Sequence, residues 1–220
     1  TGMPGLYVAP HVGGLVGLDA SPNMVAAARE NADNLACGNA TYVVGDAQDL
    51  PFSDGEFDGV TLMGSLGSMD CAAAEAVMRE SGRVLEAGGM LAIEDYDWQA
   101  FMEDRPLTAG RIWQNERGVT LEVVERTLDP HGERHTRYVV ARDTPSDRRL
   151  RQEFGDARPA PTDLRLADLR PEDVVDAYYD EVTRFDAGTL RELAIAHGFG
   201  DVQVQTFDVF GPSLFLTARK

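Results

Sequence analysis

The stretch GLVGLDASPNM, from Gly14 to Met24, decides the fold. Its run from Leu15 to Leu18 is short and apolar, as in a strand that is buried on both faces. The run ends on Asp19, after which Ser21 can cap a helix and Pro22 suits the first helical position. An acid at the carboxyl end of a buried strand lies where open α/β sheets bind ligands, and its carboxylate can accept hydrogen bonds from a ribose diol. The stretch therefore predicts a nucleotide-like cofactor.

The same pattern repeats along the first half of the chain. TYVVG, from Thr41 to Gly45, predicts a second strand and leads directly onto Asp46. FDGVTLM (57–63) and MLAIED (90–95) predict two more strands, and the apolar spacing over residues 71–85 predicts a helix between them. Strands that alternate with helices indicate a largely parallel sheet covered on both faces.

The rhythm changes after residue 96. VTLEVVERTL (119–128) and ERHTRYVVAR (133–142) flank a Pro/Gly turn and predict a β-hairpin. Residues 142–171, rich in Arg, Asp and Pro, predict an extended solvated connection, and a helix is expected from Pro171 to about Thr183.

The α/β pattern returns with a helix that begins near Asp186. DVQVQTFDVF (201–210) and SLFLTAR (213–219) then predict two strands whose tight link implies an antiparallel pair. We therefore expect a cofactor-binding core in residues 1–98, an inserted subdomain in 99–183 with its hairpin near 119–142, and the end of the core in 184–220.

Composition excludes several classes of function. A formal net charge of -17 argues against nucleic-acid binding, which depends on Lys and Arg. No apolar run approaches the roughly 20 residues that span a bilayer, so no membrane association is expected. Cys37 and Cys71 lack the spacing of a metal or redox site, which favours a reduced, cytoplasmic protein without a bound metal. Lys220 is the sole lysine, and this acidic, arginine-based composition fits either a salt-adapted organism or a GC-rich genome.

These segments resemble the class I S-adenosylmethionine-dependent methyltransferases, in particular the small-molecule branch often labelled type 11. The similar pieces are TG (1–2), GLVGLDASPNMV (14–25), VVGDAQDLPF (43–52), FDGVTLM (57–63), RVLEAGGMLAIED (83–95), LRELAIAHGFGDVQV (190–204) and LFLTAR (214–219). They occur in the order of the family and cover most of the chain except roughly residues 99–183. The resemblance implies a Rossmann-like α/β fold, mostly parallel with an antiparallel last strand, that carries an inserted α+β lid.

The resemblance also implies how S-adenosylmethionine and its product S-adenosylhomocysteine are held. Asp19 would accept hydrogen bonds from the ribose hydroxyls, with Ala20 beside it and Met24 near the adenine. Asp46 would accept from the adenine amino group, and the Ala47 N–H would meet a ring nitrogen.

The remaining cofactor contacts implied by the resemblance come from two loops. Met63 and Gly64 would line the methionine part, and Gly2 would belong to the glycine loop beneath it. In the family this loop follows a central first strand, whereas this sequence begins at the last Thr-Gly of the pattern. We therefore expect the natural protein to carry further N-terminal sequence that includes that strand.

Candidates on the acceptor side are fewer, because methyl transfer needs alignment and exclusion of water more than a fixed set of catalytic residues. Glu94, Asp95 and Tyr96 follow the fourth predicted strand and are the catalytic candidates. His131 is expected to be solvent-exposed at the hairpin turn, and His135 to lie on a surface or interface.

The inserted subdomain is the expected determinant of a small-molecule acceptor. Its aromatic residues could either form an apolar acceptor pocket or only pack the subdomain; they are Trp98, Phe101, Trp113, Tyr178 and Tyr179. The hairpin could also pair with its copy in a homodimer, because long β-rich edges associate readily.

Three functions remain open. The first is transfer of a methyl group to an O, N or C atom of a small molecule. The second is a catalytically impaired protein that keeps the methyltransferase fold for binding or regulation. The third is a nicotinamide-dependent oxidoreductase, since Asp19 also resembles the ribose-binding acid of that fold.

Overall fold

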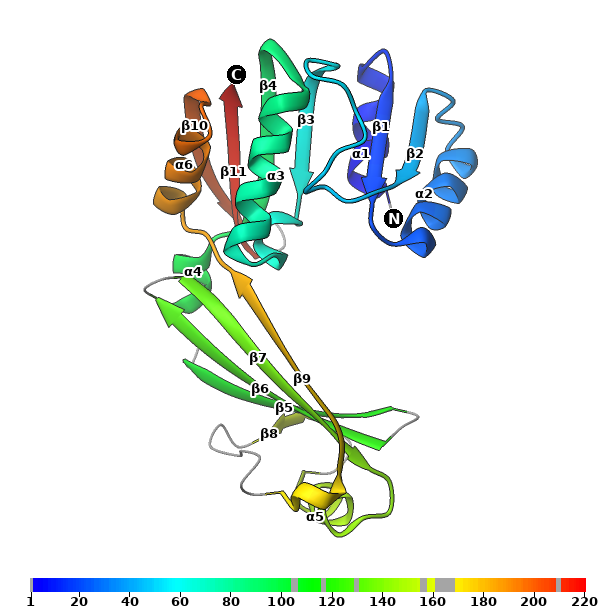
Figure 1. The fold of residues 1–220 in the computed structure, drawn as a ribbon, viewed down its shortest axis with the longest axis vertical. Helices are drawn as coiled ribbons and strands as arrows, with labels where there is room; N and C mark the ends of the chain where they lie inside the picture. The colour runs from blue at the N-terminus through cyan, green and yellow to red at the C-terminus, as the bar shows by residue number, and fades with distance from the viewer. Residues whose placement is uncertain are drawn as a thin grey trace. The chain divides into compact units, whose positions relative to one another are not determined.

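The chain forms two compact units, which the computed structural model describes over residues 2–103, 107–115, 118–128, 131–154, 158–160, 169–208 and 211–220. Unit 1 comprises Thr1–Leu66, Cys71–Asp95 and Ala187–Lys220. Unit 2 comprises Gly67–Asp70 and Tyr96–Asp186. Figure 1 shows the α/β elements of unit 1 and the long antiparallel strands of unit 2.

Unit 1 contains the predicted strands in two sheets. The first pairs β1 (Leu15–Asp19) in parallel with β2 (Ala40–Val44). The second has the order β10-β11-β4-β3 and is built from β3 (Phe57–Met63), β4 (Leu85–Tyr96), β10 (Gly200–Asp208) and β11 (Pro212–Arg219). β3 and β4 are parallel, and β10 and β11 are antiparallel, so the mixed α/β sheet is confirmed.

The strand order in unit 1 leaves β1 and β3 unpaired with each other. Within the described residues, β1 pairs only with β2, and β3 pairs only with β4. The central strand expected between β1 and β3 stays a prediction.

The helices of unit 1 begin and end close to the expected residues. They are α1 (Met3–Val8), α2 (Pro22–Asn34), α3 (Cys71–Val84) and α6 (Ala187–Ala196), with a 3-10 turn at Ala9–His11, while a second 3-10 turn at Leu66–Ser68 crosses into unit 2. One core cluster joins α1 and α2 to the first sheet through Leu6, Val25, Ala28, Ala32 and Tyr42. This cluster holds β1 and β2 against the helices that begin beside their ends.

Unit 2 is a five-stranded antiparallel sheet of order β8-β5-β6-β7-β9. Its strands are β5 (Thr108–Asn115), β6 (Gly118–Leu128), β7 (His131–Ala141), β8 (Arg158–Ala160) and β9 (Val174–Thr183). The helices are α4 (Trp98–Met102) and α5 (Pro145–Phe154), and a 3-10 turn covers Pro171–Asp173. The predicted hairpin is confirmed as β6–β7, although residues 129 and 130 of its turn lie outside the described residues.

Two predictions in this region were wrong. The expected connection contains α5, whose Asp147 N–H is capped by the Thr144 hydroxyl at 3.2 Å and whose Leu150 is fully buried. The expected helix from residue 171 is largely the strand β9, which pairs with β7 along most of its length. β9 is rich in β-branched and aromatic residues, which favour a strand once a pairing edge is present.

Both strands of the hairpin have neighbours on each side within the described residues. β6 is paired with β5 and β7, and β7 is paired with β6 and β9. These pairings do not support a dimer through a free hairpin edge, and the homodimer stays a prediction.

The two faces of the unit 2 sheet differ in polarity. One face packs into an apolar cluster of Ile112, Val119, Leu121, Val140, Leu150 and Leu169. Because side chains alternate along a strand, Glu122 and Arg126 of β6 lie on the opposite face, together with Glu133, His135 and Arg137 of β7. We call these five residues, with Arg184, the charged face.

Candidate cofactor-binding site

The carboxyl end of β1 holds Asp19 in a tight turn before α2. Its Oδ1 accepts a hydrogen bond from the Ser21 N–H at 2.8 Å, and the Ser21 hydroxyl accepts one from the Met24 N–H at 3.4 Å. The side chain of Asp19 is exposed, and no hydrogen bond within the described residues uses its Oδ2. One carboxylate oxygen therefore fixes the turn and the other is available to a ligand.

Asp46 occupies the equivalent position after β2. Its Oδ1 accepts from the Gln48 N–H at 2.9 Å, and the residue is exposed. The Gly45 N–H donates to the Asp19 carbonyl at 3.1 Å, which brings the ends of the two strands together. The parallel register pairs Asp19 with Val44, so Asp19 and Asp46 lie at the same edge of the first sheet.

The other predicted adenosine contacts surround this edge. Ala20 and Met24 are exposed at the start of α2, and Ala47 follows Asp46 as a half-buried residue. The arrangement provides two carboxylates, one backbone N–H and one apolar side chain, which is the donor and acceptor set that an adenosine moiety requires.

Gly2 precedes α1 in a conformation that requires glycine. Its φ is +69°, and a Cβ there would lie 2.9 Å from both the Ala28 Cβ and the Tyr42 ring. Thr1, the other residue of the predicted glycine-loop remnant, lies outside the described residues.

The second predicted edge joins β3 to β4. Met63 pairs with Glu94, and the Gly64 N–H donates to the Glu94 carbonyl at 2.8 Å. Gly64 has a φ of +61°, and a Cβ there would lie 3.8 Å from the Glu94 Oε2. The Glu94 carboxylate therefore lies close beside the Gly64 turn, whose positive φ favours glycine.

The three catalytic candidates have different environments. Glu94 is half-buried, and burial, followed by repulsion from Asp95, raises the pKa of its carboxyl group. Asp95 is only 4% exposed, whereas Tyr96 is 56% exposed and belongs to unit 2. Of these three, Glu94 best combines access with a perturbed proton affinity.

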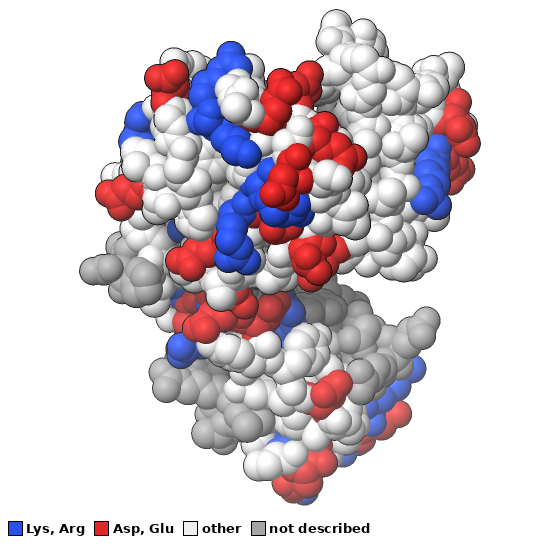
Figure 2. Space-filling model, turned by 45° about the horizontal axis from the view of Figure 1, so that its top comes forward, with Lys and Arg blue, Asp and Glu red and all other residues white. Residues whose placement is uncertain are grey.

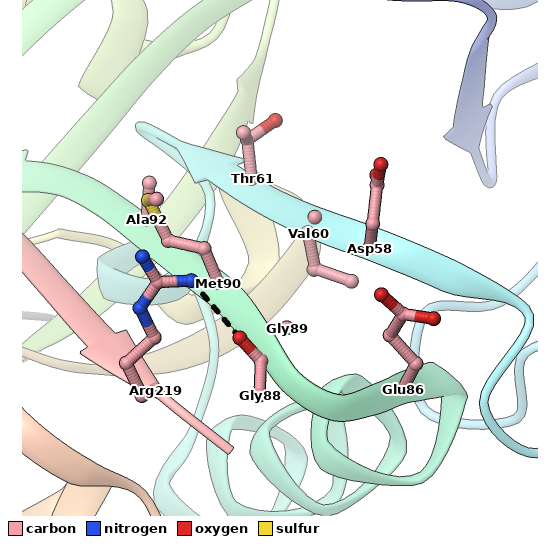
Figure 3. Close-up of a pocket in the computed structure, with 10 residues that line it drawn as sticks. Asp58, Val60, Thr61, Glu86, Gly88, Gly89, Met90, Ala92 and Arg219 are labelled. Carbon is pink, nitrogen blue, oxygen red and sulfur yellow. Dashed lines mark hydrogen bonds between the residues drawn. The ribbon is translucent and has the colours of Figure 1, made fainter.

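A cavity of about 410 Å³ in unit 1 contains none of these residues. It is lined by residues 58–61 of β3, by residues near Gly88 of β4 and by Arg219 of β11, which donates to the Gly88 carbonyl at 2.9 Å (Figure 3). This cavity lies toward the amino-terminal part of β3, away from the edge that ends at Gly64. We do not assign the cofactor to it.

Among the described side chains of unit 2, Trp98 and Phe101 stack on each other, whereas Tyr178 and Tyr179 point to opposite faces of the sheet. Trp98 is 1% exposed, stacks on Phe101 at 5.6 Å and donates from Nε1 to the Thr127 carbonyl at 3.3 Å. Tyr178 and Tyr179 are neighbours in β9, so they point to opposite faces of the sheet. Trp98 therefore packs the subdomain, and the side chain of Trp113 lies outside the described residues.

Two expectations about histidines were wrong. His131 is half-buried at the start of β7, with Nδ1 3.4 Å from the Asp186 carboxylate. His135 lies between two carboxylates of the charged face, with Nδ1 3.2 Å from Glu122 and Nε2 3.5 Å from Glu133. The contacts with Asp186 and Glu122 link residues that are distant in sequence, whereas Glu133 lies two residues from His135 on the same strand.

Comparison with known proteins shows a similarity to methyltransferases over the first part of the chain. Residues 1–89 match the family model described as a methyltransferase domain. A methyltransferase of Synechocystis sp., itself uncharacterised, is 39% identical over 94 residues, which are 43% of this chain and 42% of that protein. Over residues 1–89 the chain is therefore similar to methyltransferase domains.

Two further proteins that resemble this chain have methyltransferase names. A demethylmenaquinone methyltransferase of Staphylococcus carnosus is 41% identical over 78 residues, which are 36% of this chain and 31% of that protein. A solved S-adenosylmethionine-dependent methyltransferase of Methanosarcina mazei has a TM-score of 0.58 at 17% identity, over 98% of this chain and 86% of that one. The chain spans less than half the length of the curated relatives it matches.

Surface charge and hydropathy add two facts about the molecule. In Figure 2 acidic side chains are spread over the visible face, and basic side chains lie among them. No helix within the described ranges has the length and apolar character needed to cross a bilayer.

Proposed function

We propose that this protein transfers a methyl group from S-adenosylmethionine to an O, N or C atom of a small-molecule acceptor. The observation that carries the proposal is the placement of Asp19 and Asp46 at the ends of two adjacent parallel strands. Each is fixed by a turn hydrogen bond through one oxygen. A pair of carboxylates in this setting suits the ribose diol and the adenine amino group.

The residues present fit the cofactor. Asp19 would hold the ribose, Asp46 and the Ala47 N–H the adenine, and Met24 would pack beside the ring. Met63 and Gly64 would line the methionine part, with Gly2 in the loop beneath it and Ala20 beside Asp19. Support comes from the positive φ of both glycines and from the unused Oδ2 of Asp19.

The bound cofactor supplies a methyl group on a positively charged sulfur. The protein has to orient the acceptor, exclude water and, for a hydroxyl acceptor, take up its proton. We assign the last task to Glu94, because the side chain is half-buried and its carboxylate lies beside the Gly64 turn. Its raised pKa makes the carboxylate a better proton acceptor than an ordinary glutamate.

The acceptor is proposed to be recognised by unit 2. Tyr178 supplies an exposed aromatic ring there, next to Arg137, whose guanidinium lies 5.5 Å from the ring centre. The names of the demethylmenaquinone methyltransferases suggest that small organic acceptors occur among the relatives.

The decisive experiment is calorimetric titration of S-adenosylhomocysteine into the full-length protein and two variants. Asp19→Ala removes a charge-assisted acceptor, and we expect affinity to fall about tenfold or more, in line with about 1.5–3 kcal/mol for such bonds. Asp33→Ala, an equal change at an exposed position near the end of α2, should leave affinity unchanged.

Two outcomes would favour the other functions. Binding of S-adenosylhomocysteine without turnover across a wide acceptor panel would indicate a catalytically impaired binding protein. Binding of NADH in the absence of any binding of S-adenosylhomocysteine would indicate an oxidoreductase and overturn the proposal.

A further inference from the structure

The loop that links the two sheets of unit 1 begins with the proposed adenine-binding turn. Residues 45–56 lead from the end of β2 to the start of β3 (Figure 1). The Asp49 N–H donates to the Asp46 carbonyl at 3.2 Å, which closes the turn. A Cβ on Gly45 would lie 3.8 Å from the Cδ of Pro51, so this proline lies beside the start of the turn. The segment that follows the turn therefore folds back against it.

The end of α3 holds this segment through one arginine. Arg83 uses all five N–H groups of its guanidinium. Two of them donate to loop carbonyls, to Leu50 at 2.9 Å and to Phe52 at 2.7 Å. Two others donate to the Glu80 carboxylate at 2.7 and 2.9 Å, and the fifth donates to Asp54 at 2.9 Å. The planar guanidinium therefore has a single orientation relative to the loop.

Glu80 completes this attachment from the same helix. Its Oε2 accepts from the Leu50 N–H at 2.9 Å, so side chains of α3 bind both backbone polar groups of Leu50. Glu80 is 8% exposed, and the hydrogen bond from Arg83 lowers the pKa of its carboxyl group, although burial acts in the opposite direction. The Gly55 N–H also donates to the Arg83 carbonyl at 3.0 Å. We call Glu80 and Arg83 the loop clamp.

The loop clamp acts on the backbone that carries Asp46. The Asp46 Oδ1 accepts from the Gln48 N–H inside the turn, and within the described residues the carboxylate makes no hydrogen bond to another element. The direction of this carboxylate therefore depends on the backbone on either side of it. Before the turn that backbone is fixed by β2, and after it by the bonds from Leu50 and Phe52 to the loop clamp.

We infer that Glu80 and Arg83 are positioning residues that fix the Asp46 turn and thereby set the preference of the cofactor site for adenine over other purine bases. The inference rests on the proposed function, because Asp46 and the Ala47 N–H are assigned to the adenine there. The adenine amino group can donate to a carboxylate, whereas the carbonyl that replaces it in hypoxanthine cannot. A site rejects such an analogue only when its own polar group is held in place and is left unpaired by the wrong base.

The first experiment measures this preference by calorimetric titration of the full-length protein with two ligands. They are S-adenosylhomocysteine and S-inosylhomocysteine, in which a carbonyl replaces the adenine amino group. We expect the unmodified protein to bind the first ligand about tenfold or more tightly than the second, as a lost charge-assisted hydrogen bond requires.

The matched variants test the arginine. Arg83→Lys keeps the positive charge, but its ammonium group has only three donors and cannot bond Glu80 and both loop carbonyls in the same geometry. We expect the preference for S-adenosylhomocysteine to fall to about threefold or less in this variant. Arg79→Lys makes the same change at an exposed position of the same helix and should keep the wild-type preference. A role of Arg83 in stability alone would leave the ratio of the two affinities unchanged.

The second experiment needs no substitution. Coupling between the clamp and the base is reciprocal, so binding of the base must stabilise the clamp. Hydrogen exchange of the Leu50 amide, which donates to Glu80, is measured in the free protein and with each ligand at saturation. We expect S-adenosylhomocysteine to slow this exchange about tenfold and S-inosylhomocysteine to slow it less. Equal protection by the two ligands would overturn the inference.

The outcomes separate this inference from the proposed function. Unmodified protein that does not bind S-adenosylhomocysteine overturns both. Equal binding of the two ligands by the unmodified protein overturns the inference but leaves the proposed methyl transfer standing. An unchanged preference in Arg83→Lys overturns the inference alone. If Arg83→Lys fails to fold, the exchange of the Leu50 amide in the unmodified protein still decides the question.

Discussion

The stability of unit 2 should fall as His135 loses its proton. Hydrogen bonds to Glu122 and then Glu133 raise the pKa of His135 from 6.5 to about 9, although burial acts in the opposite direction. The side chain is 16% exposed, so solvent screens these contacts only in part. Because the pKa is higher in the folded than in the unfolded protein, the stabilisation is complete below about pH 6.5 and is lost as pH rises through about 9.

The size of the effect follows from the same two values. A rise from 6.5 to about 9 strengthens proton binding roughly 300-fold, which corresponds to about 3 kcal/mol of unfolding free energy. Replacement of His135 by glutamine should remove this contribution at neutral pH. The variant should also lose the decline between pH 6.5 and 9.5, because no proton is then bound at this position.

Tryptophan fluorescence during urea unfolding provides the assay. Trp98 and Trp113 are the two tryptophans of the chain, and both belong to unit 2, so the signal reports this unit. The matched control is His11→Gln, a change at an exposed histidine of unit 1, which should keep the wild-type pH dependence. An equally steep decline in His135→Gln would refute the reasoning, because the decline would then belong to other groups.

Two further substitutions test unit 1. Gly17→Ala should lower the free energy of unfolding by about 1–3 kcal/mol in thermal or urea unfolding, because the new Cβ would lie 2.4 Å from the Tyr42 ring. In the control Gly59→Ala, the new Cβ would lie 3.9 Å from its nearest neighbour, so the free energy of unfolding should fall less. Equal decreases in the two variants would contradict this packing. Glu94→Gln should slow methylation of hydroxyl acceptors by about 10²–10⁴-fold and remove the rise of kcat/KM with pH, while leaving S-adenosylhomocysteine affinity unchanged. Glu86→Gln, at the other end of β4, is its control, and an unchanged rate in Glu94→Gln would exclude it as the proton acceptor.

The sequence predicted those elements whose signals are local. β3 occupies the predicted Phe57–Met63, because a short apolar run there is bounded by a Gly turn on one side and a Gly loop on the other. The helix over Pro22–Asn34 was predictable from its Ser cap and its first-position Pro. The strand β9 could not be predicted in this way, because these residues form a strand only when they pair with β7, a segment that is distant in the chain.

In the candidate site, too, some residues could be predicted from local sequence and others could not. The position of Asp19 could be predicted because it follows its strand directly, and parallel pairing then brings Asp46 to the same edge. The bridge made by Arg184 could not be predicted, since its two partners, Gly67 and Glu133, are remote from it in sequence. A single arginine near the end of a strand is ordinarily a solvated surface residue, and only the fold shows that this one is 21% exposed and doubly bonded.

The charged face needs an explanation beyond stability, because a buried ion pair can often be replaced by apolar residues without loss of folding free energy. Apolar residues could cover β6 and β7, but they could not donate to the Gly67 carbonyl, which is part of a buried segment. A donor at this point must be charged or polar, and a buried cation requires a buried carboxylate beside it. Glu133 provides that carboxylate, and Arg126 and His135 fix its position. The need to hold one loop carbonyl after β3 thus accounts for a network that packing alone would not require.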